Sequence, residues 1–264
     1  MKVLLLDAVT LVKTRRSVRK FKPVKVPREV VYSILDLARW APSAHNAQPW
    51  RCIAIDDENV KVKLANEMGR AWLSDMLRDG VAKEKAEEIV KLESWKRITE
   101  SPVIIIVCLT MENMHKYPDM RRQRAEYLMG VQSVAAYIQT LLLSAHYHGL
   151  GACWVCAPLF CPSAVRKVLG LPRNVEPQAM ITMGYADEKP TPPPRKELND
   201  ICFFNSWTEK LHRCCPHNSL QNLNFARKPL TWGLRSINST MAPDIRTSMK
   251  ALTIINAITG CGTP

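Results

Sequence analysis

The stretch Trp40-Ala41-Pro42-Ser43-Ala44-His45-Asn46-Ala47-Gln48-Pro49-Trp50 is the part of the chain around which the rest is organised. Two prolines enclose Ser, His, Asn and Gln side chains, and two tryptophans enclose the whole stretch. Because proline fixes φ and lacks a backbone donor, Pro42 should end the preceding helix and Pro49 should begin extended chain. The sequence therefore predicts a rigid, polar-lined turn held by aromatic packing, which suits the binding of a flat molecule with polar edges.

Two helical segments precede this turn. Residues 7–13 are amphipathic and lead into the basic segment 14–21, where arginines and a serine could bind an anion. A solvated basic turn is the alternative interpretation. Pro27 fits the first position of a second helix that reaches Trp40, and its predicted inward stripe consists of Val30, Ile34, Leu37 and Ala38.

Strand patterns follow the turn. Residues 51–55 are expected to form a buried strand that ends at two aspartates. The β-branched run Val103–Leu109 is typical of a central strand covered on both faces, and residues 178–185 suggest another strand. Between the strands expected at residues 51–55 and 103–109, residues 61–98 are highly charged and helical, with breaks expected at Gly69 and Gly80. This segment could be a solvated helical surface or a lid over a substrate, and the sequence leaves both alternatives open.

The longest predicted helix spans residues 123–148 and has apolar residues around much of its circumference, as a core helix does. His146 and His148 lie near its end, where we expect them to cap the negative end of the helix dipole, and Gly149 should end it. The following Gly-x-Gly comes after a helix and lacks the last glycine of a dinucleotide fingerprint, which excludes a Rossmann site.

Composition narrows the class of protein. The 264 residues are 47% hydrophobic and carry a formal charge of +13, which indicates a globular protein with a basic surface or an anionic ligand. The nine cysteines have no disulfide-framework spacing and no secretory signal is evident, so we expect a reduced, cytoplasmic protein without a membrane span. Cys153, Cys156 and Cys161 lack a second pair at zinc spacing, and we expect buried thiols and no metal site. Basic and aromatic residues do not interleave as in a nucleic-acid binder.

The chain changes character after about residue 207. Residues 209–264 hold seven Lys or Arg against two acidic residues and show no sustained helical or strand period. We expect residues 1–207 to form one domain and residues 208–264 to form a basic, poorly ordered tail. Its His212, Cys214, Cys215 and His217 match no familiar metal spacing.

Three separated stretches, in order, resemble the FMN-dependent nitroreductase family: residues 15–21, residues 41–50 and residues 149–154. Gly184-Tyr185 with residues 192–196 is similar to the closing motif of that family. The resemblance covers about residues 7–207. It implies an α+β fold with a mostly antiparallel central sheet flanked by helices, and an intertwined homodimer that shares its FMN sites.

The resemblance also implies which residues bind FMN. Arg15 and Ser17 would hold the phosphate, Arg16 would lie near the phosphate or ribityl chain, and Arg19 would lie near flavin N1 and O2. The turn would reach the flavin of the other subunit through Pro42, Ser43, Ala44 and Asn46. The isoalloxazine would be lined by Trp154, Val155 and Cys156, and Arg195 or Lys196 would complete the phosphate site. No protein nucleophile is required, since the cofactor supplies the chemistry, and His45 is expected to be packed or solvent-facing.

The implied activity is that of a ping-pong oxidoreductase. It would pass electrons from NAD(P)H or another reductant through FMN to an organic acceptor such as a nitroaromatic, a quinone or an enone. A narrower resemblance, through residues 117–126 and 157–160, is to the flavin domain of coenzyme F420 glutamate ligases. The alternatives are therefore a reductase of an F420 precursor and a flavin- or F420-binding module without turnover.

Overall fold

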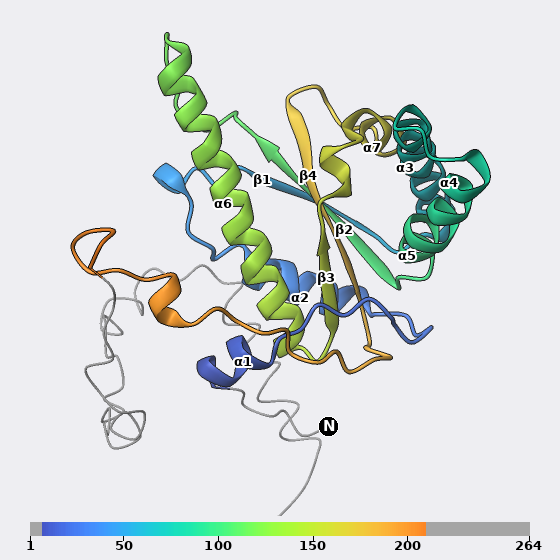
Figure 1. Cartoon of the computed structure of the whole chain (residues 1–264), viewed down its shortest axis with the longest axis horizontal. Coiled ribbons are helices and arrows are strands. Elements are labelled where there is room, and N and C mark those ends of the chain that lie inside the picture. The colour runs from blue at the N-terminus through green and yellow to red at the C-terminus, as the bar shows by residue number, and fades with distance from the viewer. Residues whose placement is uncertain (1–6, 210–264) are drawn as a thin grey trace, which may run out of the picture. The chain divides into compact units, whose positions relative to one another are not determined.

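The computed structural model describes residues 7–209, which belong to two units (Figure 1). The first unit ends at Pro194 and the second begins at Arg195. The described part of the second unit contains the 3-10 helix η4 (Leu198–Asp200) and a stacked pair of rings, Phe203 on Trp207. The predicted domain boundary at residue 207 stays a prediction, and the predicted tail lies outside the described residues from residue 210 on.

A four-stranded antiparallel sheet forms the centre of the first unit (Figure 1). In spatial order its strands are β1 (Trp50–Ile55), β2 (Val103–Thr110), β4 (Val175–Gly184) and β3 (Gly151–Val155). This arrangement confirms the prediction of a mostly antiparallel sheet. Every residue of β2 is buried, as predicted, because β2 has a strand on each side and helices over both faces.

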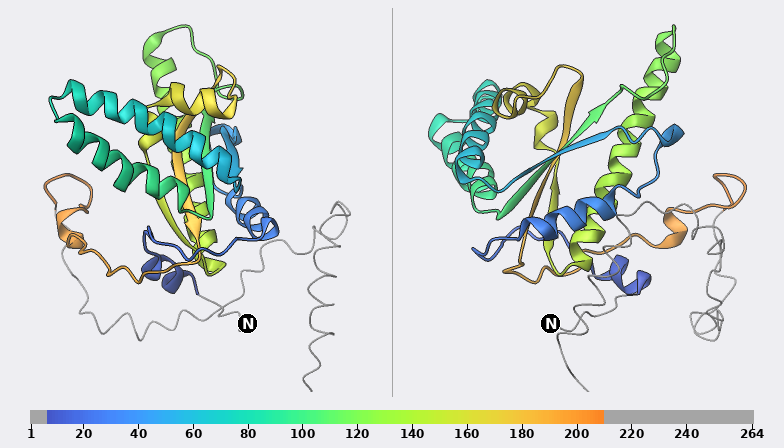
Figure 2. Two further views of the ribbon diagram at one scale, coloured as in Figure 1. Left: turned by 90° about the vertical axis from the view of Figure 1, so that its right-hand side faces the viewer. Right: turned by 180° about the vertical axis from the view of Figure 1, so that it is seen from behind.

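Helices cover the two faces of the sheet separately (Figures 1 and 2). One face carries α2 (Arg28–Ala38) and α6 (Met120–Tyr147). The other face carries α3 (Glu58–Arg78), α5 (Lys96–Thr99) and α7 (Pro162–Leu169), with α4 (Lys83–Ile89) and the π-helical turn η2 (Val90–Trp95) beside α3. Alternate side chains of β2 point to opposite faces of the sheet and enter two separate hydrophobic cores. Ile105 packs with α2 and α6, whereas Ile104 and Ile106 pack with α3 and α7.

The core helix α6 begins three residues before its predicted start. The side chain of Asp119 caps it by accepting a hydrogen bond from the Arg122 amide (2.9 Å). At its other end, the ring of His148 lies 2.8 Å from the Ser144 carbonyl, and Gly149 ends the helix with a φ of +77°. By length and composition α6 could cross a membrane, but half of its most apolar window is buried inside this fold.

One predicted helix break is wrong. Helix α3 runs through Gly69 without interruption, because this glycine serves close packing instead of a turn. A Cβ at Gly69 would lie 2.8 Å from Cγ1 of Val90. The second predicted break is confirmed, since Gly80 has a φ of +82° just after α3.

The burial of two other segments was also predicted incorrectly. Strand β1 lies at the edge of the sheet, so Arg51 and Ala54 are exposed and the strand is not buried. On α2, Leu37 is exposed and Val31 takes its place in the core. The side chain of Trp40 is 75% exposed, so aromatic packing holds the turn only through Trp50, which is buried.

Candidate functional site

The basic segment after α1 (Ala8–Thr14) is fixed along the outer edge of β3. The amide of Val18 donates a hydrogen bond to the carbonyl of Ala152 (3.1 Å). The amide of Lys22 donates another to the carbonyl of Tyr185 (2.8 Å). Residues 17–22 are therefore held between β3 and the chain that follows β4, which brings two of the predicted cofactor motifs together.

A carboxylate and a glycine complete this attachment. Glu188 Oε1 accepts hydrogen bonds from the amides of Arg19 (2.5 Å) and Lys20 (3.1 Å). A Cβ at Gly151 would lie 2.7 Å from Cβ of Val18, so only glycine allows this close approach. Gly151, from the stretch at residues 149–154, thus allows the stretch at residues 15–21 to pack closely against β3.

The side chains of this segment concentrate positive charge. Arg15, Arg16 and Ser17 are half-buried, and Arg19 is exposed. The pKa of the neighbouring His146 is lowered, first by its burial and then by the charges of Arg15 and Arg16. The Arg16 guanidinium donates to the backbone carbonyls of Lys13 (2.7 Å) and Arg15 (2.8 Å), which holds it against its own segment.

The far end of β3 carries the residues predicted to line an aromatic ring system. Trp154 and Cys156 are exposed and Val155 is half-buried, just before η3 (Ala157–Leu159). Three residues lie between Ala152 and Cys156, and the four steps along the chain span about 13 Å when extended. The strand thus places cationic donors beside its start and an aromatic side chain at its end, an arrangement that suits an elongated ligand with an anionic terminus.

Hydrogen bonds hold the turn between α2 and β1. Ser43 Oγ accepts a hydrogen bond from the Gln48 amide (3.1 Å), and the Ala44 amide donates to Ser133 Oγ on α6 (3.1 Å). Left-handed backbone conformations, which cost energy outside glycine, occur at three of its residues: His45, Asn46 and Gln48. The 3-10 helix η1 (Ala44–Asn46) forms the middle of the turn.

The structure does not bring this turn to the other predicted site residues of the same chain. Figures 1 and 2 place η1 on the opposite side of α6 from β3. Pro42 and Asn46 are exposed there, and Ser43 and Ala44 are half-buried. Arg195 and Lys196 are exposed in the second unit, and their part in a phosphate site stays a prediction.

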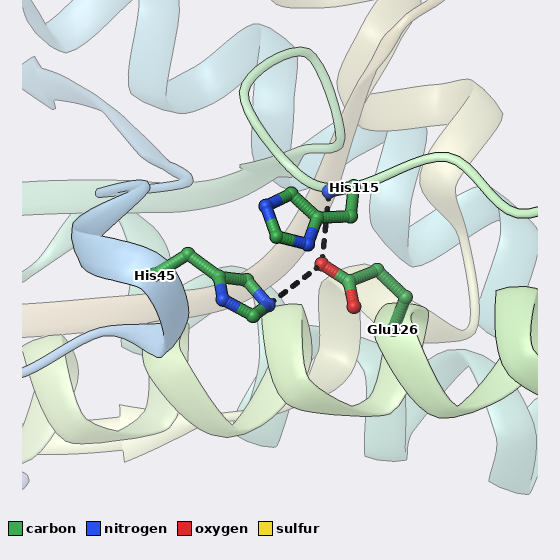
Figure 3. Close-up of side chains that lie close together, drawn as sticks. All are labelled: His45, His115 and Glu126. Atoms are coloured by element: carbon green, nitrogen blue, oxygen red, sulfur yellow. Dashed lines mark hydrogen bonds and ion pairs between the residues drawn. The ribbon is translucent and has the colours of Figure 1, made fainter.

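A polar cluster that the sequence did not predict lies beside the turn (Figure 3). His45 Nε2 lies 3.3 Å from Glu126 Oε1, and the same oxygen accepts a hydrogen bond from the His115 amide (2.9 Å). The two imidazole rings stack with centroids 3.9 Å apart. The three residues come from separate segments, so no local spacing could have indicated the cluster. His45 is exposed, and its ring is stacked on that of His115.

Of the three cysteines that were expected to be buried, Cys153 is buried and Cys161 is half-buried, but Cys156 is exposed, because it lies just after β3 ends. Burial raises the pKa of the Cys153 thiol and raises that of Cys161 to about 11. Because metals bind the thiolate and not the thiol, these two side chains are poor ligands. Cys161 instead donates to the carbonyl of Ala157 (3.3 Å).

The donor set along β3 fits FMN. A phosphate needs several fixed cationic donors, and Arg15, Ser17 and Arg19 lie within one anchored segment. The acidic neighbour Glu188 accepts hydrogen bonds from the backbone amides of Arg19 and Lys20. The exposed Trp154 offers an aromatic and partly polar surface for a flat ring.

Comparison with known proteins agrees with this reading. The sequence model of the Nitroreductase family matches residues 12–185. A Methanothermobacter thermautotrophicus protein named as an NADH dehydrogenase/NAD(P)H nitroreductase is 30% identical, over 72% of this chain and 82% of its own. An iodotyrosine deiodinase of Thermotoga neapolitana is 29% identical, over 75% of this chain and 97% of its own. The solved structure of an iodotyrosine deiodinase bound to FMN and 3-iodo-L-tyrosine has 27% identity and a TM-score of 0.58, and the match covers 75% and 99% of the two chains.

Proposed function

Because the chain belongs to the nitroreductase family and is an FMN-dependent oxidoreductase, we propose that it takes electrons from NAD(P)H and passes them to a small organic acceptor in a ping-pong cycle. The observation that carries the proposal is the attachment of the basic segment to β3 by the hydrogen bond from Val18 to Ala152. When bound, FMN would supply the hydride and electron chemistry. The residues of the chain bind it, orient it and set the charge around it.

In this proposal different residues bind the different parts of the cofactor. Arg15 and Ser17 bind the phosphate, with Arg16 at the phosphate or ribityl chain and Arg195 or Lys196 completing the site. Arg19 places a cation where negative charge collects on reduction, which stabilises the charged form. The ring lies along Trp154, Val155 and Cys156.

The turn would then serve the second subunit. Since η1 lies across α6 from β3, the proposed homodimer brings Pro42, Ser43, Ala44 and Asn46 to the flavin held by the partner subunit. Large apolar side chains that are exposed on and just after α2 support a contact surface there: Tyr32, Leu37 and Trp40. We expect this homodimer to function in the cytoplasm.

A cavity of about 670 Å³ beside Cys156 offers room for the acceptor. Trp72 from α3 and Phe160 after η3 give it apolar walls. Its charged lining combines two arginines with three acidic residues: Arg78, Arg97, Asp75, Asp79 and Glu93. This mixed lining suits an aromatic acceptor with polar groups. Halogenated tyrosines join the nitroaromatics, quinones and enones as candidates, because two of the relatives are iodotyrosine deiodinases.

The decisive experiment is anaerobic reduction of the full-length protein loaded with FMN. We expect NADH or NADPH to bleach the flavin band near ~450 nm and one of the four acceptor classes to restore it. Bleaching by dithionite but by neither nicotinamide would contradict the proposed reductant. A protein that cannot be loaded with FMN would overturn the whole proposal.

A further inference from the structure

The cluster of His45, His115 and Glu126 has the composition and shape of a cation site (Figure 3). Each residue offers one ligand atom, and these atoms all lie within 4.8 Å of one another. His45 comes from η1, His115 from the loop after β2, and Glu126 from the second turn of α6. We propose that these three side chains bind one divalent first-row transition ion, such as Zn²⁺, with water in the fourth position.

The burial of Glu126 is the first argument. Its side chain is only 2% exposed, and a carboxylate removed from water needs a compensating positive charge. The groups against it are the ring of His45 and the backbone amide of His115. The two imidazole rings stack 3.9 Å apart beside it. One divalent ion bound by the three side chains would supply the compensating charge.

The ligand chemistry is the second argument. Two imidazoles and one carboxylate form a set that Zn²⁺ uses in sites with an open coordination position. Mg²⁺ and Ca²⁺ prefer oxygen ligands, so a set with two nitrogens favours a transition ion over either of them. The partial exposure of His45, at 34%, leaves a path by which an ion and its water can enter.

The geometry requires a small closure. In a tetrahedral site, Zn–N and Zn–O bonds of about 2.1 Å place neighbouring ligand atoms about 3.4 Å apart, and the three ligand atoms here all lie within 4.8 Å of one another. Rotation of the exposed His115 side chain can supply that movement, because it lies on a loop. Glu126 and His45 are held more firmly, by α6 and by the hydrogen bond from Ala44 to Ser133.

Occupancy of this site would link three segments of the fold. It would tie η1 and the loop after β2 to α6, at the turn whose Ala44 and Asn46 flank His45. The expected readout is therefore metal binding and a gain in thermal stability, neither of which depends on turnover.

The test is calorimetric titration of Zn²⁺ into the full-length, FMN-loaded protein after dialysis against a chelator. We expect one site per chain, with affinity reduced at least tenfold in His115→Ala and in Glu126→Gln. His115→Phe keeps a ring stacked on His45 but removes the ligand, so it should lose the site even if His115→Ala folds poorly. The matched control is Glu112→Gln, which removes an exposed carboxylate from the same loop and should leave the affinity unchanged.

X-ray absorption separates this site from thiolate binding elsewhere in the chain. The proposed ligands give a shell of N and O atoms at about 2.0–2.1 Å, whereas cysteine sulfur lies at about 2.3 Å. Sulfur-dominated coordination would overturn the proposal, as would Zn²⁺ affinity that is the same in wild type and His115→Phe. An absence of Zn²⁺ binding by wild type would also overturn it, and none of these results bears on FMN reduction.

Discussion

The amide of Val18 donates a 3.1 Å hydrogen bond to the carbonyl of Ala152, and Cβ of Val18 would meet any side chain placed at Gly151. This single contact joins the segment that carries the proposed phosphate ligands to the strand that carries the proposed ring-binding residues.

Removing the guanidinium of Arg15 should weaken FMN binding by about 1–3 kcal/mol, the scale of a hydrogen bond to a charged group. Quenching of flavin fluorescence on titration measures the affinity. Arg28→Ala is a suitable control, because Arg28 pairs with Asp56 at an exposed position outside the proposed site. Equal affinities for Arg15→Ala and wild type would show that the phosphate lies elsewhere.

A methyl group at position 151 should disrupt the junction. In Gly151→Ala the new Cβ would lie 2.7 Å from Cβ of Val18, and overpacking of this kind costs about 1–3 kcal/mol. We expect a lower free energy of unfolding and weaker FMN binding. The double variant Val18→Ala/Gly151→Ala removes Cγ1 and Cγ2 of Val18, which would also lie 2.7 and 2.8 Å from the new Cβ, so it should recover part of both losses. A purely additive double variant would contradict the proposed contact.

The carboxylate of Glu188 should matter for the shape of the basic segment. Glu188→Gln keeps the size of the side chain but replaces a charged acceptor of two amides by a neutral one. We expect a loss of about 1–2 kcal/mol in stability and faster hydrogen exchange of the Arg19 and Lys20 amides. Unchanged exchange at both amides would rule out this anchoring role.

Alkaline pH should destabilise the protein through its buried thiols. Burial, reinforced by Cys52, raises the pKa of Cys108 from 9.0 to about 12. The unfolded chain therefore loses this proton first, and the free energy of unfolding falls as pH rises through the window from 9 to 12. In urea unfolding, Cys108→Ala should reduce that slope by up to about 1.4 kcal/mol per pH unit, whereas Cys156→Ala, at an exposed position, should not.

The proposed homodimer can be tested at its exposed aromatic residues. Trp40 is 75% exposed beside the turn, so Trp40→Glu should convert the dimer to monomers and remove FMN. Analytical ultracentrifugation and flavin content report the two effects. Leu77→Glu changes an apolar side chain that is 41% exposed on α3 and should remain dimeric. A Trp40→Glu dimer with full FMN content would contradict the shared site.

The sequence predicted the elements whose signals are local. The apolar run of β2, the glycine after α6 and the prolines of the turn each act on their own neighbourhood, and the structure confirms them. Gly69 was misread because its reason is a contact with Val90, from another helix. The burial of Leu37 and of β1 depended on which elements lie next to them, which periodicity does not encode.

In the candidate site, too, local motifs could be recognised from the sequence and contacts between distant segments could not. From motif order we predicted that the basic segment, the turn and the end of β3 bind the cofactor, and this stays a prediction. The cluster of His45, His115 and Glu126 could not be predicted, since it exists only where η1, a loop and α6 converge. The sequence also does not show that the Glu126 carboxylate is buried, which is the feature that indicates a cation there.

The position of the basic segment has a further consequence for solubility. Strand β3 is an edge strand, and an unpaired edge invites pairing with other chains. The segment from Ser17 to Phe21 covers that edge through its bridge to Ala152. The segment that carries the proposed phosphate ligands thus also covers an edge of the sheet that could otherwise pair with another chain.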